Sequence, residues 1–175
     1  MQAPLEHEIL LPVKAGFIAA TLASACLLNV LQWGGAWRWL RPDFVALVLL
    51  YWGVHQPRRL GFGVAWLIGL LMDISDASLF GQHALGYTVL MYAAVVLHRR
   101  VLMLGLLSQV LQVAPLLLAT DFIMLLIRLL MGAKFPGWGY FAPSLIGALL
   151  WAPVTVAFRL PQVPRPDPNS GVRVP

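Results

Sequence analysis

The sequence predicts an all-α membrane protein of about six transmembrane helices. Hydrophobic residues make up 60% of the 175 residues and charged residues only 11%, with a mean hydropathy of +0.80. A soluble domain usually carries about 25% charged residues, so this composition argues against a surface that faces only water. The apolar residues also fall into runs that are separated by charged residues and by Gly and Pro clusters, which is typical of a polytopic membrane protein.

The apolar runs define the predicted helices. They cover residues 13–31, 42–55, 60–73, 84–97, 101–131 and 141–160. We expect one transmembrane domain over residues 1–160 and a Pro-rich, disordered cytoplasmic tail over residues 161–175. Pro42 is expected in the first turn of the second helix, where its missing N–H costs nothing. Asp43 beside it would place a negative charge at the positive end of the helix dipole.

Three of these segments have unusual lengths. Segments 42–55 and 61–73 hold about 14 apolar residues each, fewer than the ~17 that usually span a bilayer. They are expected to tilt, to thin the bilayer, or to form a re-entrant hairpin inside the bundle. Segment 101–131 would extend roughly 45 Å as a straight helix, against about 30 Å of hydrocarbon. Pro115 is therefore expected to kink this helix, unless the helix tilts.

The Lys and Arg residues predict the orientation. With both termini inside the cell, the cytoplasmic set is Lys14, Arg58, Arg59, Arg99, Arg100, Arg159, Arg165 and Arg173. The external set is Arg38, Arg41 and Lys134. Because positive residues favour the cytoplasmic side, this asymmetry predicts an N-in, C-in topology. The basic residues then form a fringe near anionic headgroups, and the absence of a long basic run argues against a nucleic-acid site.

Small residues recur along two of the predicted helices. They are Ala15, Gly16, Ala19, Ala20, Ala23 and Ser24 in the first, and Gly61, Gly63, Ala65 and Gly69 in the third. Small faces let helices approach closely where lipid supplies no hydrophobic driving force. We expect both helices to pack tightly, either within the chain or against a partner helix.

Charged residues near the outer interface suggest a link between the second and third helices. Asp73 ends the third helix, where the dipole disfavours an anion, and Asp76 follows it. One hypothesis is that Asp73 or Asp76 pairs with Arg41. The alternative is that these charges are separately solvated, since exposed ion pairs contribute little.

Asp121 lies deeper, within the fifth predicted helix. Arg128 is seven residues further on, about 10 Å away along the helix, so a direct bond between them is not expected. Arg128 is expected to extend towards the interface. Asp121 is expected to face other helices, with Gln112 and Ser108 on a similar side. A proton or ion relay is the alternative role, but the sequence offers no second acid near Asp121 to support it.

No motif indicates catalysis, a cofactor or a metal. The sequence contains no G-x-S-x-G, no H-E-x-x-H and no phosphate-binding glycine loop. Its four His residues have no metal-ligand spacing. The single Cys26 excludes an internal disulfide and is expected to pack in a helix interface.

Several short motifs occur in the order and spacing of one known family. Arg41-Pro42-Asp43 is followed by residues 47–52, Leu-Val-Leu-Leu-Tyr-Trp. Residues 69–73, Gly-Leu-Leu-Met-Asp, precede Ser75, Leu79, Gly81 and Leu85. Asp121 and the segment 147–153, with Leu150-Trp151 and Pro153, complete the pattern. Over nearly its whole length the chain resembles the MreD family of bacterial rod shape-determining membrane proteins.

This resemblance implies a location, partners and a fold. Members of the family are multi-pass proteins of the bacterial cytoplasmic (inner) membrane. They associate with MreC, and through it with MreB, RodA and a class B penicillin-binding transpeptidase, to direct peptidoglycan synthesis along the side wall. Their bundle is similar to the substrate-binding component of energy-coupling-factor transporters. No enzymatic activity or cofactor is implied, and a homo-oligomer is possible.

Ten residues are candidates for structural or partner-interaction roles. They are Arg41, Pro42, Asp43, Gly69, Asp73, Asp76, Gly81, Asp121, Trp151 and Pro153. The first functional hypothesis is a non-enzymatic scaffold of the elongation machinery, and the alternative is a vitamin-binding subunit of a transporter, which rests on fold kinship. That alternative needs a polar pocket open to the outside, for which Trp33, Trp37, Trp39 and Trp138 are candidate lining residues, although an aromatic belt at the membrane interface explains them equally well. An intramembrane enzyme has the least support.

Overall fold

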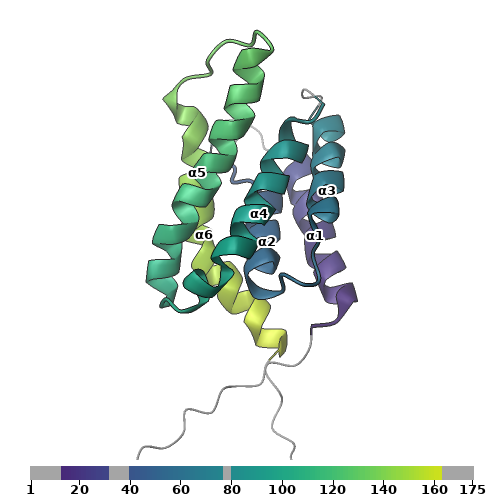
Figure 1. Cartoon of the computed structure of the whole chain (residues 1–175), viewed down its shortest axis with the longest axis vertical. Coiled ribbons are helices and arrows are strands. Elements are labelled where there is room, and N and C mark those ends of the chain that lie inside the picture. Colours follow the sequence, from purple (N-terminus) through teal and green to yellow (C-terminus); the bar gives the residue numbers. More distant parts are fainter. Residues whose placement is uncertain (1–12, 32–39, 77–79, 163–175) are drawn as a thin grey trace, which may run out of the picture.

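The computed structural model describes residues 13–31, 40–76 and 80–162, and its regular secondary structure over these ranges is helical, joined by turns and loops (Figure 1). The helices are α1 (Ala15–Val30), α2 (Phe44–His55), α3 (Phe62–Ser75), α4 (Gln82–Leu102), α5 (Leu106–Leu130) and α6 (Ala142–Arg159). Two short 3-10 helices, η2 (Trp138–Phe141) and η3 (Leu160–Gln162), flank α6. The prediction of six helices is confirmed. Arg38, three of the four tryptophans named above (Trp33, Trp37 and Trp39) and the tail from residue 163 lie outside the described ranges.

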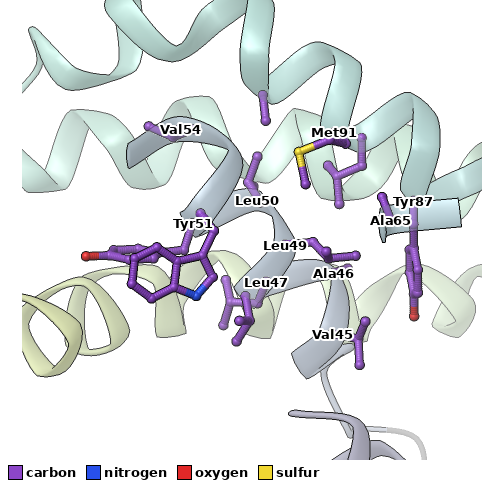
Figure 2. Packing of buried hydrophobic residues seen from close by; sticks show 14 of the residues in the cluster. Val45, Ala46, Leu47, Leu49, Leu50, Tyr51, Val54, Ala65, Tyr87 and Met91 are labelled. Atoms are coloured by element: carbon purple, nitrogen blue, oxygen red, sulfur yellow. The ribbon is translucent and has the colours of Figure 1, made fainter. Parts of the chain in front are cut away.

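Helix α2 forms the centre of the bundle. Its residues 45–54 are all buried, which explains why this helix is apolar on every face and not on one stripe. It packs on α1, α4 and α6. Figure 2 shows Leu50 of α2 directed towards Met91 of α4, while Tyr51 points to the opposite side. A helix of 12 residues is about 18 Å long, so α2 is too short for a bilayer but is enclosed by protein.

From α3 to α6, each helix packs against the next one in the sequence. Contacts are extensive between α3 and α4, between α4 and α5, and between α5 and α6. By length and composition, Gln82–Leu102, Leu106–Leu130 and Trp138–Arg159 are long and apolar enough to cross a membrane. Large apolar side chains on these helices, such as Leu107, Leu111 and Leu149, are more than two-thirds exposed. Such a surface is suited to contact with lipid.

The predicted boundary between the fourth and fifth helices is wrong. Helix α4 continues through the His98-Arg99-Arg100 triplet to Leu102, and α5 begins at Leu106. Basic residues do not break a helix, and they are favourable in its last turn, where they face the negative end of the dipole. The chain turns instead at residues 103–105, with Gly105 as the N-cap of α5. At 25 residues, α5 is about 37 Å long, shorter than the predicted single helix.

Charge divides the bundle into two ends. The chain runs alternately up and down, so the ends of α1, α3 and α5 lie beside the starts of α2, α4 and α6 (Figure 1). All four acidic residues of the described part lie towards this end, which we call the polar end: Asp43, Asp73, Asp76 and Asp121. The opposite, basic end carries Lys14, Arg58, Arg59, Arg99, Arg100 and Arg159, and no acidic residue within the described ranges.

Candidate functional site

Asp43 is the centre of a hydrogen-bond network that joins three helices. It is the N-cap of α2, and its Oδ1 accepts the Ala46 backbone N–H at 3.0 Å. The same oxygen accepts the Asn29 side-chain amide of α1 at 2.8 Å. Its Oδ2 accepts the Tyr87 hydroxyl of α4 at 2.8 Å. Pro42 therefore precedes the N-cap, and its predicted place inside the first helical turn is wrong.

Arg41 closes the end of α1 instead of pairing with an acid. Its Nη1 donates to the backbone carbonyl of Asn29 at 2.6 Å and, more weakly, to that of Leu31 at 3.4 Å. A cation at these carbonyls is favourable because they carry the negative end of the α1 dipole. The proposed ion pair of Arg41 with Asp73 or Asp76 is therefore wrong.

Asp73 binds the start of the next helix. Its carboxylate accepts the backbone N–H groups of Gly81 (2.9 Å), His83 (2.8 Å) and Ala84 (3.4 Å). It also accepts the His83 ring Nδ1–H at 2.8 Å. Asp73 lies in the last turn of α3, where the dipole of its own helix is unfavourable. The positive N-terminus of α4 compensates for this, because it presents unpaired N–H groups to the carboxylate.

Two glycines make the contact between α3 and α4 possible. A Cβ atom at Gly69 would overlap the backbone of Ala84, so the two helices touch at the backbone. Gly81 has φ +96°, a left-handed conformation that side chains rarely adopt, and it turns the chain back into α4. Asp76 is the C-cap of α3 and lies before this turn, with one oxygen 3.8 Å from His83 Nε2.

The predicted small-residue faces have different outcomes. Ala65 and Gly69 of α3 are buried, which confirms tight packing on that side. The six small residues of α1 are all exposed, so they form no close contact within the described chain.

Asp121 connects α5 to α6. Its Oδ2 accepts the Ser144 hydroxyl, which lies in the first turn of α6. The prediction that Asp121 faces another helix is confirmed. The accompanying prediction about Ser108 is wrong, because that residue is exposed; its neighbour Gln109 is the buried one.

Trp151 is an anchor of the core. Its indole Nε1–H donates to Gln109 Oε1 at 3.0 Å, and both side chains are buried between α5 and α6. Its neighbour Pro153 lies inside α6 on an exposed face. Of these two candidates, only Trp151 joins helices.

A cleft opens among these polar groups. Its volume is about 210 Å³. The lining residues are Asn29, Arg41, Pro42, Asp43, Asp76, His83, Asp121, Met124, Gly139, Tyr140 and Pro143. Trp138 does not line it. Five of the ten candidate residues, Arg41, Pro42, Asp43, Asp76 and Asp121, thus meet at one site, whereas Gly69, Asp73 and Gly81 support it from the α3–α4 turn.

The cleft combines charged groups of both signs whose positions are fixed. Asp43, Asp121 and Arg41 are each already hydrogen-bonded to another part of the chain, so their positions are fixed. Within the described residues, no three of the His, Cys, Asp and Glu side chains are placed to hold a metal ion. Fixed charges of both signs are suited to binding a polar peptide segment.

The model of the family described as "rod shape-determining protein MreD" matches residues 13–160. The chain belongs to the MreD family. A relative from Haemophilus influenzae (strain ATCC 51907 / DSM 11121 / KW20 / Rd), named "Rod shape-determining protein MreD", is 27% identical over 135 residues. That alignment covers 77% of this chain and 83% of the relative. No solved structure matches.

Membership of the MreD family indicates a role in determining rod shape. MreD proteins are a structural, shape-determining family and not a known enzyme family. The family and the three long apolar helices are those of a membrane protein. The resemblance found in the sequence motifs is therefore confirmed.

Several residues of the site were missed by the sequence analysis. Asn29, His83, Tyr87, Gln109 and Ser144 all contribute hydrogen bonds between helices or caps. Asn29 and Gln109 could have been predicted, because an amide inside an apolar run of a membrane protein needs a hydrogen-bond partner from another part of the protein. His83 and Ser144 lie in the first turns of α4 and α6, where polar residues are common and do not indicate a partner.

Proposed function

We propose that this chain is a non-enzymatic scaffold of the rod elongation machinery, held in the bacterial inner membrane as a multi-pass protein. In this proposal it binds MreC directly and, through MreC, MreB, RodA and a class B penicillin-binding transpeptidase. It thereby helps to direct side-wall peptidoglycan synthesis. The family membership supports the shape-determining role, and the polar cleft is the single structural observation that supports partner binding.

The charge distribution supports an N-in, C-in orientation. The basic end carries six cations and no acid among the described residues, as expected for the cytoplasmic side. The polar cleft would then open to the outside of the membrane. A partner with one transmembrane helix and a large external domain would approach it with the segment that leaves the bilayer.

The cleft is suited to a few side chains of such a segment. Pockets for small molecules usually measure about 300–1,000 Å³, whereas this cleft has about 210 Å³. Its size therefore favours a peptide over a vitamin. Asp76 is exposed and lines the cleft, so it is available to a cationic side chain of the partner.

A neighbouring groove offers a place for the helix of the partner. It lies between α1, α2 and α6, has a volume of about 440 Å³, and is lined mostly by apolar residues. Leu28 and Phe44 line this groove, and their sequence neighbours Asn29 and Asp43 line the cleft, so the two surfaces adjoin. The exposed Ala20 and Ser24 of α1 let a second helix approach closely here.

Filling the cleft tests this proposal. Gly139 lines the cleft, and a Cβ atom added there would meet no atom within 4 Å, so Gly139→Trp is designed to fill the cleft from a position where the backbone leaves room for a side chain. Gly105→Trp is the matched control, because Gly105 is equally unobstructed but lies at the basic end. We expect Gly139→Trp to abolish co-purification with MreC and to round rod-shaped cells at unchanged protein abundance. Equal MreC recovery from both variants would contradict binding at the cleft.

Depletion of the protein from its native cells tests the wider role. Rounding with loss of side-wall synthesis supports the scaffold. Unchanged shape together with a nutrient requirement would contradict it and would favour the small-molecule transporter subunit instead.

A further inference from the structure

We propose that an anionic phospholipid binds in a groove between α1 and α3 at the basic end, with its phosphate at Arg59 and an acyl chain along α1. The groove has a volume of about 360 Å³. Its lining residues are Ala15, Ile18, Ala19, Leu22, Arg59, Leu60 and Val64. Helix α1 packs chiefly on α2 and has little contact with α3, which leaves this space open.

The walls of the groove are suited to an acyl chain. Apart from Arg59, every lining residue is apolar. Ala15 and Ala19 lie one turn apart on α1, and their small side chains leave room beside the larger Leu22 and Val64. From Ala15 to Leu22 the helix extends about 10 Å, enough for the first methylenes of a fatty acid.

Arg59 is held in place at the end of the groove. Its Nη1 donates to the backbone carbonyl of Val13 at 2.8 Å. A guanidinium has five N–H donors, so others remain for a phosphate, which it binds through charge-assisted hydrogen bonds. Because this contact fixes the side chain in advance, binding costs less conformational entropy than at a free surface arginine. Arg58 and Lys14 are exposed beside it and add positive charge.

Two helix N-termini strengthen the anion site. Both α1 and α3 begin at this end, and neither has a side-chain hydrogen bond at its N-cap. The dipoles of both helices favour an anion at this end. Gly16, Gly61 and Gly63 lie in these first turns, and a Cβ at each would meet no atom within 4 Å. A headgroup can thus approach the backbone closely.

Charge complementarity identifies the occupant. A second copy of this end, or a basic partner, would place cations against cations. Free phosphate would match Arg59 but would leave the apolar groove empty. An anionic phospholipid matches both Arg59 and the apolar groove. Such lipids are abundant in membranes, and the described helices are suited to a membrane.

Native mass spectrometry of the purified full-length chain in detergent tests the proposal. The probes are phosphatidylglycerol and phosphatidylcholine with identical acyl chains. We expect preferential retention of phosphatidylglycerol, and Arg59→Gln should lower that retention about fivefold, the factor equivalent to the ~1 kcal/mol of one basic residue near an anionic surface. Arg100→Gln is the charge control, since it removes an exposed cation from the same end but outside the groove.

A steric pair tests the acyl half independently. Ala19→Leu fills the groove and should reduce retention of both lipids, whereas Ala23→Leu, on the exposed face of α1 but outside the groove, should change neither. Equal effects of Arg59→Gln and Arg100→Gln would overturn the proposal, because binding would then reflect only general surface charge. Equal retention of the two lipids by the unmodified protein, or equal effects of the two leucine variants, would also overturn it.

Discussion

The two ends of the bundle use charge in opposite ways. At the polar end, Asp43 and Asp73 accept hydrogen bonds from other helices or from helix N-termini, and Asp121 accepts one from Ser144. At the basic end, most cations are exposed. Arg59 is also exposed, but it donates a hydrogen bond to the backbone carbonyl of Val13. A buried charge that is fully hydrogen-bonded fixes the geometry of its neighbours. An exposed charge fixes little within the chain and remains available to lipid headgroups.

The largest expected effect comes from removing the buried carboxylate that caps α4. Asp73→Ala leaves the N–H groups of Gly81 and His83 without their acceptor, and Asp73 is only 1% exposed. We expect the free energy of unfolding in detergent to fall by about 3 kcal/mol. Asp76→Ala is the control, because that carboxylate is exposed and should cost far less. Similar losses for both variants would contradict the capping role of Asp73.

A smaller effect is expected where α3 touches α4. Gly69→Ala places a Cβ against the Ala84 backbone, so the helices must separate, at a cost of about 2 kcal/mol. Gly63→Ala on the open face of the same helix should be neutral or stabilising by up to about 1 kcal/mol, through its higher helix propensity. Thermal unfolding of the two variants measures the difference. A stable Gly69→Ala protein would show that the close contact is dispensable.

Tyr87→Phe removes one hydrogen bond of the Asp43 network and keeps the packing. A bond from a buried hydroxyl to a carboxylate contributes about 1.5 kcal/mol, which is the expected loss of stability. A double-mutant cycle with Asp43→Ala, which removes both acceptor oxygens, measures the coupling directly. Additive effects of the two substitutions would mean that the hydroxyl and the carboxylate do not interact.

The smallest effect is expected at the basic end. Arg100→Gln removes an exposed cation from the last turn of α4, so the free energy of unfolding should change by no more than about 0.5 kcal/mol. Chemical unfolding in detergent measures this difference. A loss as large as that of Tyr87→Phe would contradict the contrast between the two ends.

Much of the helical arrangement followed from the sequence. The six apolar runs located six helices, and the uniform apolar character of segment 42–55 agrees with a helix buried on all sides. The error at the boundary between α4 and α5 has a physical cause. The charges of His98-Arg99-Arg100 suggest a helix break, whereas a helix C-terminus favours cations, and the break lies at Gly105.

The candidate site was only partly predictable. Arg41, Asp43 and Asp121 were identified as important, but the partners assigned to Arg41 were wrong. Asp73 looked unfavourable at the end of its own helix, and only the turn at Gly81, which brings the N-terminus of α4 to it, explains its position. Asn29 lies within an apolar region, and its amide indicates a hydrogen-bond partner inside the bundle.

The amino-acid sequence by itself determined that the described chain is helical and apolar enough for a membrane, and which end carries its basic residues. These properties depend on the composition of the chain and on the order of neighbouring residues, which can be read directly from the sequence. Only the tertiary structure decided which groups each buried charge binds. Those partners come from other helices or from beyond a turn, and their distances depend on how the helices pack around α2, which no spacing in the sequence records.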